Sequence, residues 1–77
     1  MNPREEVVKA RYEAEGWRML RNGAPDFVAL KVGSDGEITD MQAVEVKGPK
    51  ADLTYEQSVF RKVFEKAGIR YCVEVVE

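Results

Sequence analysis

Apolar and polar positions follow a helical period at the start of this chain. A helix is predicted over residues 3–15, with Asn2 suited to cap it, Pro3 to an early helical position and Gly16 to end it. Its apolar stripe comprises Val7, Ala10 and Ala14, extended by Val8 and Tyr12. The sequence therefore begins with an amphipathic helix.

A second helical pattern lies in the second half of the chain. Thr54 is a good N-cap, and Gln57 three residues later completes the spacing of a capping box. The apolar residues at helical spacing are Val59, Phe60, Val63, Phe64 and Ala67. A helix is predicted to run to about Lys66, with Gly68 as its stop.

Between and after the helices, the pattern changes to that of strands. Strands are predicted over residues 17–21, 27–32, 38–47 and 69–76. The turn at 33–36 contains two glycines, so the second and third strands form a hairpin. The order αβββαβ predicts a small α/β fold, a mixed sheet flanked by two helices.

Length and composition narrow the class of protein to which this chain can belong. The 77 residues are expected to form one domain, 1–77. A chain of this length buries only about 60% of its unfolded surface, so its stability is marginal. The single cysteine, Cys72, cannot form an internal disulfide. Oligomerisation is therefore expected to supply the missing stability. The absence of histidine argues against the usual zinc sites and histidine-based triads. With no apolar stretch of membrane length and no visible signal peptide, we expect a cytoplasmic protein without membrane association.

Three charged residues carry the candidate chemistry: Asp26 after Pro25, and the pair Glu45 and Lys47. Side chains two apart on a strand point to the same face, so Glu45 and Lys47 project together. A hairpin turning at 33–36 would leave Asp26 a few residues off direct opposition to Glu45, unless twist or a register shift joins them. An exposed Glu45–Lys47 pair on a polar sheet face is an equally compatible interpretation, and Pro-Asp is ordinary turn chemistry.

The order of several short motifs resembles a known family. They are Glu5 in the first helix, Gly16-Trp17, Gly23-Ala24-Pro25-Asp26-Phe27-Val28-Ala29-Leu30, Val44-Glu45-Val46-Lys47 and Leu53-Thr54-Tyr55-Glu56-Gln57. Together they resemble the PD-(D/E)XK nuclease superfamily, and within it the small VRR-NUC and archaeal Holliday-junction-resolvase-like members. The resemblance covers nearly the whole chain and implies a restriction-endonuclease-like core. The chain has almost nothing beyond that core, whereas family members usually take substrate choice from additions or dimerisation.

The resemblance implies a role for each matched residue. Asp26, Glu45, the carbonyl of Val46 and Glu5 would hold Mg²⁺ or Mn²⁺. Lys47 would position or activate the attacking water, and Gln57 would orient Lys47 or a phosphate. Simpler interpretations stand beside these: Glu5 and Glu6 are both acids that stabilise a helix N-terminus, and Gln57 is the capping partner of Thr54. We select Glu5 over Glu6 by its distance from Gly16.

Four further residues are candidates for DNA contacts: Arg21, Asn22, Lys50 and Tyr55. Each is also compatible with an exposed polar or aromatic position. The sequence therefore predicts a metal-dependent DNA endonuclease, a homodimer acting on branched DNA such as a four-way junction. Matched two-fold symmetry of protein and junction would place two cuts symmetrically. A flap or nicking nuclease, or a catalytically silent nucleic-acid-binding or assembly module of the same fold, are the alternatives.

Overall fold

The computed structural model describes residues 1–77 and contains the six expected elements. They are α1 (Pro3–Ala14), β1 (Arg18–Arg21), β2 (Phe27–Val32), β3 (Ile38–Lys47), α2 (Tyr55–Lys66) and β4 (Arg70–Val75). The α/β fold and its αβββαβ order are confirmed, and every boundary lies within one or two residues of its predicted position. Neither helix has the length and apolar character needed to cross a membrane.

Local capping explains where both helices begin. The Asn2 side chain accepts a hydrogen bond from the backbone N–H of Glu5, at 2.8 Å. At α2 the capping box is complete: Thr54 Oγ1 accepts from the Gln57 N–H at 3.2 Å, and Gln57 Oε1 accepts from the Thr54 N–H at 2.9 Å. These bonds satisfy amide groups that have no partner within the helix.

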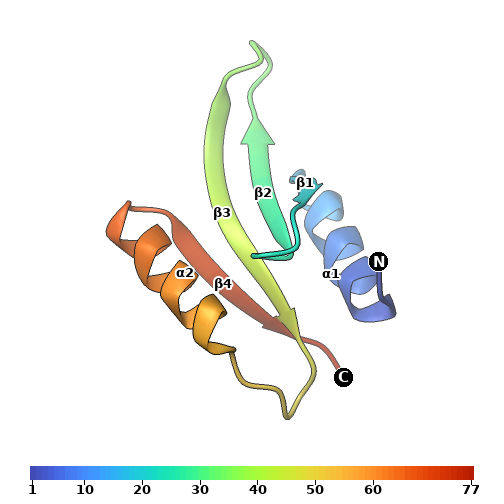
Figure 1. Cartoon of the computed structure of the whole chain (residues 1–77). Coiled ribbons are helices and arrows are strands. Elements are labelled where there is room, and N and C mark those ends of the chain that lie inside the picture. The colour runs from blue at the N-terminus through green and yellow to red at the C-terminus, as the bar shows by residue number, and fades with distance from the viewer.

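The four strands form one mixed sheet in the order β1-β2-β3-β4 (Figure 1). β1 and β2 pair antiparallel, as do β2 and β3, whereas β4 runs parallel to β3. The two helices lie on opposite sides of this sheet (Figure 1). Val8 of α1 packs in a cluster with Phe27 and Val44, while Phe64 of α2 stacks 6.0 Å from the Tyr71 ring. Alternate residues of β3 and β4 therefore face different helices.

The core lies on the α1 side and contains six buried residues, with three partly buried residues packed against them. They are Val8, Trp17, Phe27, Ala29, Val44 and Val76, and around them Tyr12, Met19 and Val46. The sequence predicted that Val7, Ala10 and Ala14 form the centre of the buried face of α1, and this is wrong. Val8 and Tyr12 face the sheet, whereas Val7, Ala10 and Ala14 are exposed. Valine and tyrosine bury more apolar surface than alanine, so the helix turns this pair inward.

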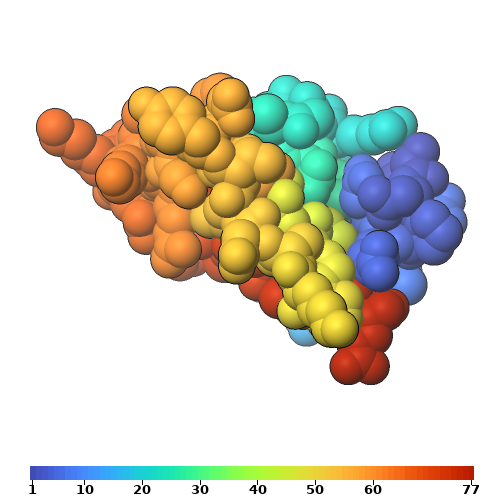
Figure 2. Space-filling model, turned by 60° about the horizontal axis from the view of Figure 1, so that its bottom comes forward, coloured from blue at the N-terminus to red at the C-terminus, as the bar shows by residue number.

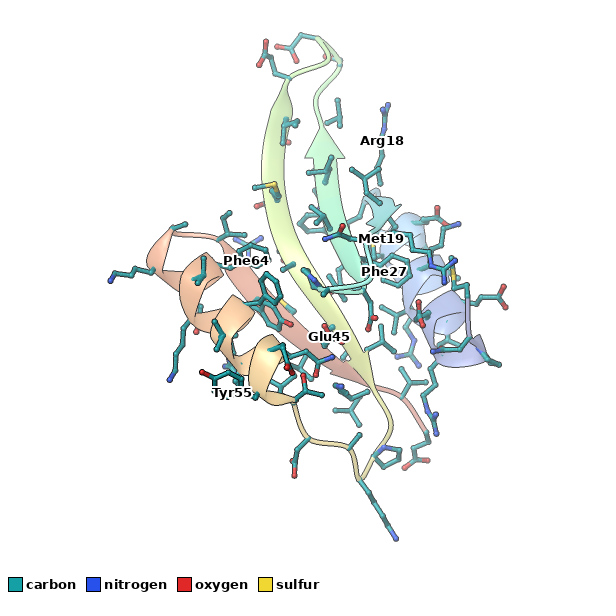
Figure 3. All side chains as sticks on the ribbon, in the orientation of Figure 1. Arg18, Met19, Phe27, Glu45, Tyr55 and Phe64 are labelled. Atoms are coloured by element: carbon teal, nitrogen blue, oxygen red, sulfur yellow. The ribbon has the colours of Figure 1, made fainter.

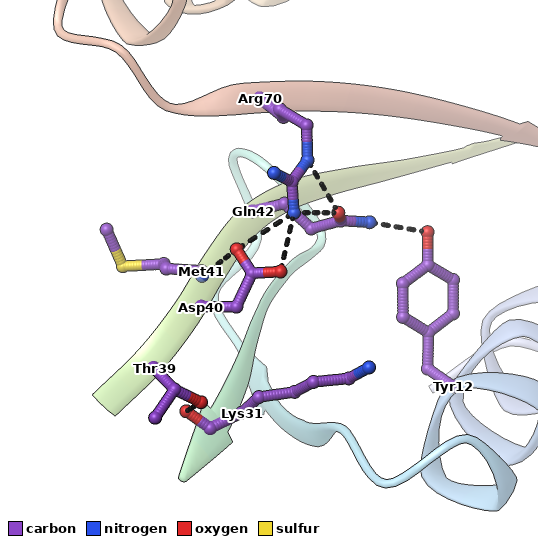
Figure 4. A network of polar contacts seen from close by, with 7 residues as sticks. All are labelled: Tyr12, Lys31, Thr39, Asp40, Met41, Gln42 and Arg70. Atoms are coloured by element: carbon purple, nitrogen blue, oxygen red, sulfur yellow. Dashed lines mark hydrogen bonds and ion pairs between the residues drawn. The ribbon is translucent and has the colours of Figure 1, made fainter. Parts of the chain in front are cut away.

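A polar network also joins α1 to the sheet on this side (Figure 4). Tyr12 donates to Glu74 at 3.0 Å and accepts from Gln42 Nε2 at 3.0 Å. Arg70 donates to Gln42 Oε1 and to both carboxylate oxygens of Asp40, and its hydrogen bonds hold the pKa of Asp40 below its usual range. The buried Gln42 amide is thus fully partnered.

One irregularity in the hairpin sets the register of the whole sheet. Val32 pairs with Ile38, but the neighbouring Lys31 pairs with Asp40, so Thr39 is an extra residue on β3. This is a β-bulge. Beyond it, every residue of β2 pairs one position further along β3 than the Val32–Ile38 pair alone would place it.

α2 differs from the expected core helix. None of its residues is buried, and Val59, Phe60 and Val63 remain exposed. The helix lies over β4 and reaches Glu45 on β3, but it leaves the same face of β1 and β2 without a covering helix. Leu20 and Met41, which point to that face, are exposed as well. The α2 side of the molecule therefore presents apolar surface to its surroundings.

Candidate active site

Glu45 is buried in the sheet with only 1% of its surface exposed. It lies on β3 near the first turn of α2, on the face that α2 covers (Figure 3). Both carboxylate oxygens are occupied: Gln57 Nε2 donates to Oε1 at 2.8 Å, and the Tyr71 hydroxyl donates to Oε2 at 3.1 Å. A buried carboxylate requires such partners because burial penalises its charge. The alternative of an exposed Glu45–Lys47 pair does not describe this site.

The register brings Asp26 to Glu45. Phe27 pairs with Val44, so one residue further along each strand Asp26 comes opposite Glu45, on the same face. The Asp26 carboxylate also accepts a hydrogen bond from the Val46 N–H at 2.8 Å. The predicted offset between Asp26 and Glu45 is removed by two shifts of one residue each: Val32 pairs with Ile38 and not with Glu37, and the β-bulge supplies the second shift.

The proximity of two carboxylates changes the protonation of Glu45. Burial, followed by hydrogen bonding with Asp26 and the charge of Asp26, raises the pKa of Glu45 to about 7. Tyr71 and Lys47 act in the opposite sense by favouring the ionised form. Without a cation, the site therefore retains a proton near neutral pH, as expected for two carboxylates sharing one place.

Lys47 lies two residues beyond Glu45 on β3 and is half-buried. Strand alternation places it on the same face as Asp26 and Glu45. Its ammonium takes part in none of the ion pairs of the structure, which join Lys9 to Glu13, Arg61 to Glu65 and Arg70 to Asp40. The amine is thus free to meet a negatively charged substrate.

Gln57 has the capping role that the sequence predicted and also a contact to Glu45 that the sequence did not predict. Its amide oxygen completes the helix cap, while its amide nitrogen holds Glu45. It orients Glu45 and not Lys47. A side chain that is fixed at both ends of its amide group positions the carboxylate rigidly, because moving it would break the cap of α2.

Tyr71 was missed by the sequence interpretation. It lies on β4, 26 residues from Glu45, and its ring is buried against Phe64. Burial and the neighbouring Glu45 charge raise the pKa of Tyr71, so it remains a hydrogen-bond donor. The only signal in the sequence is its inward position in an alternating strand, which cannot specify the partner.

Glu5 does not join the other two carboxylates. Its side chain accepts from the Asn2 side-chain amide, and no group of three or more carboxylate or cysteine side chains is close enough to hold a metal ion. Glu5 does lie on the side of α1 that carries Val8 and Tyr12 and is half-buried, whereas Glu6 is exposed. Of the two acids, Glu5 is the one turned toward the sheet.

The four candidate DNA contacts are exposed, and one of them, Asn22, is bonded to the residue that the site uses. Tyr55 begins α2, points away from the sheet and is 80% exposed (Figure 3). Arg21 is exposed at the end of β1. The N–H of Asn22 donates to the Asp26 carbonyl at 2.8 Å, so Asn22 shapes the turn that delivers Asp26. Lys50 is exposed in the loop after β3.

The residues present fit a hard divalent cation. Asp26 and Glu45 offer only oxygen ligands, and a cation between them would relieve the repulsion that adds to burial in raising the pKa of Glu45. Mg²⁺ is commonly bound through one or two carboxylates, with waters and substrate phosphates completing its shell. Two adjacent carboxylates are therefore enough protein ligands for such an ion.

The αβββαβ fold, with two acids and a lysine on one sheet face, defines the class as the PD-(D/E)XK nuclease superfamily. A family model of the VRR-NUC domain matches residues 2–77. The chain belongs to the VRR-NUC family, a nuclease family of that superfamily. Comparisons with curated proteins and with solved structures gave no match.

Proposed function

We propose that this VRR-NUC domain is a Mg²⁺- or Mn²⁺-dependent DNA endonuclease. The observation that carries the proposal is the buried Glu45, held by Gln57 and Tyr71 and aligned with Asp26 by the register of the sheet. Placing a second carboxylate beside the buried Glu45 is unfavourable unless a cation joins them. The stability of the fold therefore does not explain why the two carboxylates lie together, whereas metal binding does.

Each residue has a role that its position supports. Asp26 and Glu45 hold the ion, with the carbonyl of Val46 as a further ligand. Lys47 positions the attacking water and offsets charge at the phosphate. Gln57 and Tyr71 keep Glu45 in place. When bound, the cation lowers the pKa of coordinated water and stabilises the leaving oxygen.

The preferred substrate is branched DNA, such as a four-way junction, cut by a homodimer. Support for a second copy comes from α2, which exposes apolar side chains along its length, and from the uncovered sheet face beside it. A chain this small gains stability by covering such surface. A two-fold dimer would present two sites related by the symmetry of the junction.

The test uses labelled junction, flap and linear DNA with Mg²⁺, Mn²⁺ or EDTA. We expect cleavage only with a divalent ion and fastest on the junction. Asp26→Asn should abolish cleavage but retain DNA binding, because asparagine still accepts from the Val46 N–H. Asp35→Asn, at the far end of the hairpin, is the matched control and should cleave normally.

The outcomes separate the alternatives. Preferential cutting of flaps or of one strand of linear DNA would indicate a flap or nicking nuclease. DNA binding without cleavage in either ion would identify a catalytically silent binding module and overturn the enzymatic proposal. Cleavage by Asp26→Asn at the normal rate would refute the site assignment.

A further inference from the structure

A second feature lies at the end of the molecule where β3 leaves the sheet. An open pocket of about 560 Å³ is lined by Arg4, Gly48, Pro49, Lys50 and Ala51. Figure 2 views this end, where the segment around residue 50 lies beside the first residues of the chain and above its last residues. Segments far apart in the sequence therefore form one surface next to the last residue of β3, Lys47.

Arg4 is anchored in this pocket by a single bond. Its Nε donates to the Val76 carbonyl at 2.8 Å. A guanidinium group has five N–H donors, so the four on its two terminal nitrogens remain without protein partners here. An arginine that is tethered through Nε presents a planar fork, which matches two oxygens of a phosphate.

Gly48 makes room for this arrangement. A Cβ at position 48 would lie 3.1 Å from Arg4 Cζ and 3.2 Å from Arg4 Nη2. The guanidinium thus rests against the backbone of the loop because residue 48 has no side chain. The glycine is not required by its φ angle, which is outside the left-handed region.

The charge of the pocket contrasts with that of the chain. The protein has a formal net charge of −2, yet the lining contains two cationic residues and no acidic residue. Lys47, whose ammonium is free, immediately precedes Gly48. A local concentration of positive charge on an acidic protein marks a place for an anion.

We propose that Arg4 and Lys50 bind a DNA backbone phosphate on the strand being cut, within a few nucleotides of the scissile phosphate. The inference rests on the proposed nuclease function and adds a subsite to it. Lys50 is three residues from Lys47, a reach of at most about 11 Å. Successive phosphates rise about 3.4 Å along the axis of one strand, so this reach spans about three nucleotides. The subsite would fix the position of the cut.

The first experiment measures binding without cleavage. A labelled four-way junction is titrated with protein in EDTA at several salt concentrations. Arg4→Ala should weaken binding about tenfold and reduce the salt slope by about one, the loss of one phosphate contact. Arg11→Ala is the matched control: it removes the same charge from the last turn of the same helix. Equal effects of the two variants would overturn the proposal.

A second experiment separates phosphate binding from the anchoring of Val76. Single methylphosphonates, which lack the phosphate charge, are placed at each position flanking the cut. One substitution should weaken binding of the unaltered protein but have no effect on Arg4→Ala. Gly48→Ala, whose Cβ would displace the Arg4 guanidinium by a few tenths of an ångström, should weaken binding in the same direction by a smaller amount and serves if Arg4→Ala proves unstable. If the methylphosphonate weakens binding at every position, and does so equally in the unaltered protein and in Arg4→Ala, the subsite is refuted.

The two proposals fail in different ways. If the protein binds junction through Arg4 but never cleaves it with Mg²⁺ or Mn²⁺, the nuclease function is wrong and the phosphate site stands as a binding site. If the protein cleaves DNA and Arg4→Ala binds and cleaves as well as Arg11→Ala, the nuclease function stands and the phosphate site is wrong.

Discussion

Glu45 has two opposing sets of neighbours. Burial and Asp26 disfavour its charge, while Tyr71 and Lys47 favour it. In the proposed metal site, Glu45 is therefore held for a cation at the expense of the stability of the metal-free fold. Such a conflict is typical of a functional site, where a local arrangement is worse for folding than an uncharged alternative would be.

This conflict predicts a pH dependence of stability in EDTA. The folded pKa of Glu45, about 7, exceeds its ordinary value of 4.5, so the folded state binds this proton more tightly than the unfolded state. Its contribution to stability is complete below pH 4.5 and is lost as the pH rises through 7, by on the order of 3 kcal/mol.

Glu45→Gln should remove that loss, and should therefore be more stable than the unaltered protein at pH 8 while failing to bind Mn²⁺. Denaturant unfolding at several pH values measures the difference between the two proteins. Glu56→Gln, which changes an acid of the first turn of α2, is the control and should leave the pH dependence in place. A pH dependence in Glu45→Gln equal to that of the unaltered protein would show that Glu45 does not retain its proton.

At the scale of elements, the hydrogen bonds between elements form two groups, one on each face of the sheet. On the α2 face, Tyr71 of β4 donates to Glu45 of β3; on the α1 face, Tyr12 of α1 donates to Glu74 of β4. The two bonds are chemically alike, with lengths of 3.1 and 3.0 Å. Only the first reaches the candidate site.

This pair gives a matched test of positioning. Tyr71→Phe and Tyr12→Phe should each lower the free energy of unfolding by roughly 1–3 kcal/mol, because each removes a bond to a carboxylate. Only Tyr71→Phe should also weaken Mn²⁺ binding, by about tenfold, since Glu45 loses one of its two supports. Calorimetry with Mn²⁺ measures this. Equal Mn²⁺ affinities in the two variants would leave Tyr71 with a structural role alone.

Element boundaries and helix faces differed in how far the sequence could predict them. The caps Asn2 and Thr54 and the glycines after each helix act locally, so the boundaries followed from them. The buried face of α1 did not, because Val7 and Val8 are neighbours in sequence and only packing against Phe27 and Val44 selects Val8. For α2 the predicted stripe exists but remains exposed.

At the scale of the whole molecule, a monomer would leave the apolar surface on the α2 side exposed to water. Val63 is 55% exposed on the helix and Leu20 53% exposed on the sheet. Large exposed apolar patches indicate interaction sites. The proposed homodimer would cover this surface and leave the α1 side, with its own core, unchanged.

Val63→Glu should therefore shift the protein from a dimer toward a monomer of 8.7 kDa, because the dimer would have to bury an unpaired charge. Light scattering across a range of concentrations measures the mass. Val7→Glu, an equivalent change of an exposed valine on α1, should leave the mass unaltered. A monomer of the unaltered protein at high concentration contradicts the dimer.

The sequence by itself determined the six elements, the hairpin and the three charged residues, because caps, turns and strand alternation act over a few residues. The tertiary structure decided which of them meet. The bulge at Thr39 sets Asp26 opposite Glu45, Tyr71 reaches Glu45 from another strand, and Arg4 reaches Val76 across 72 residues. Such contacts depend on register and packing, which no local pattern encodes.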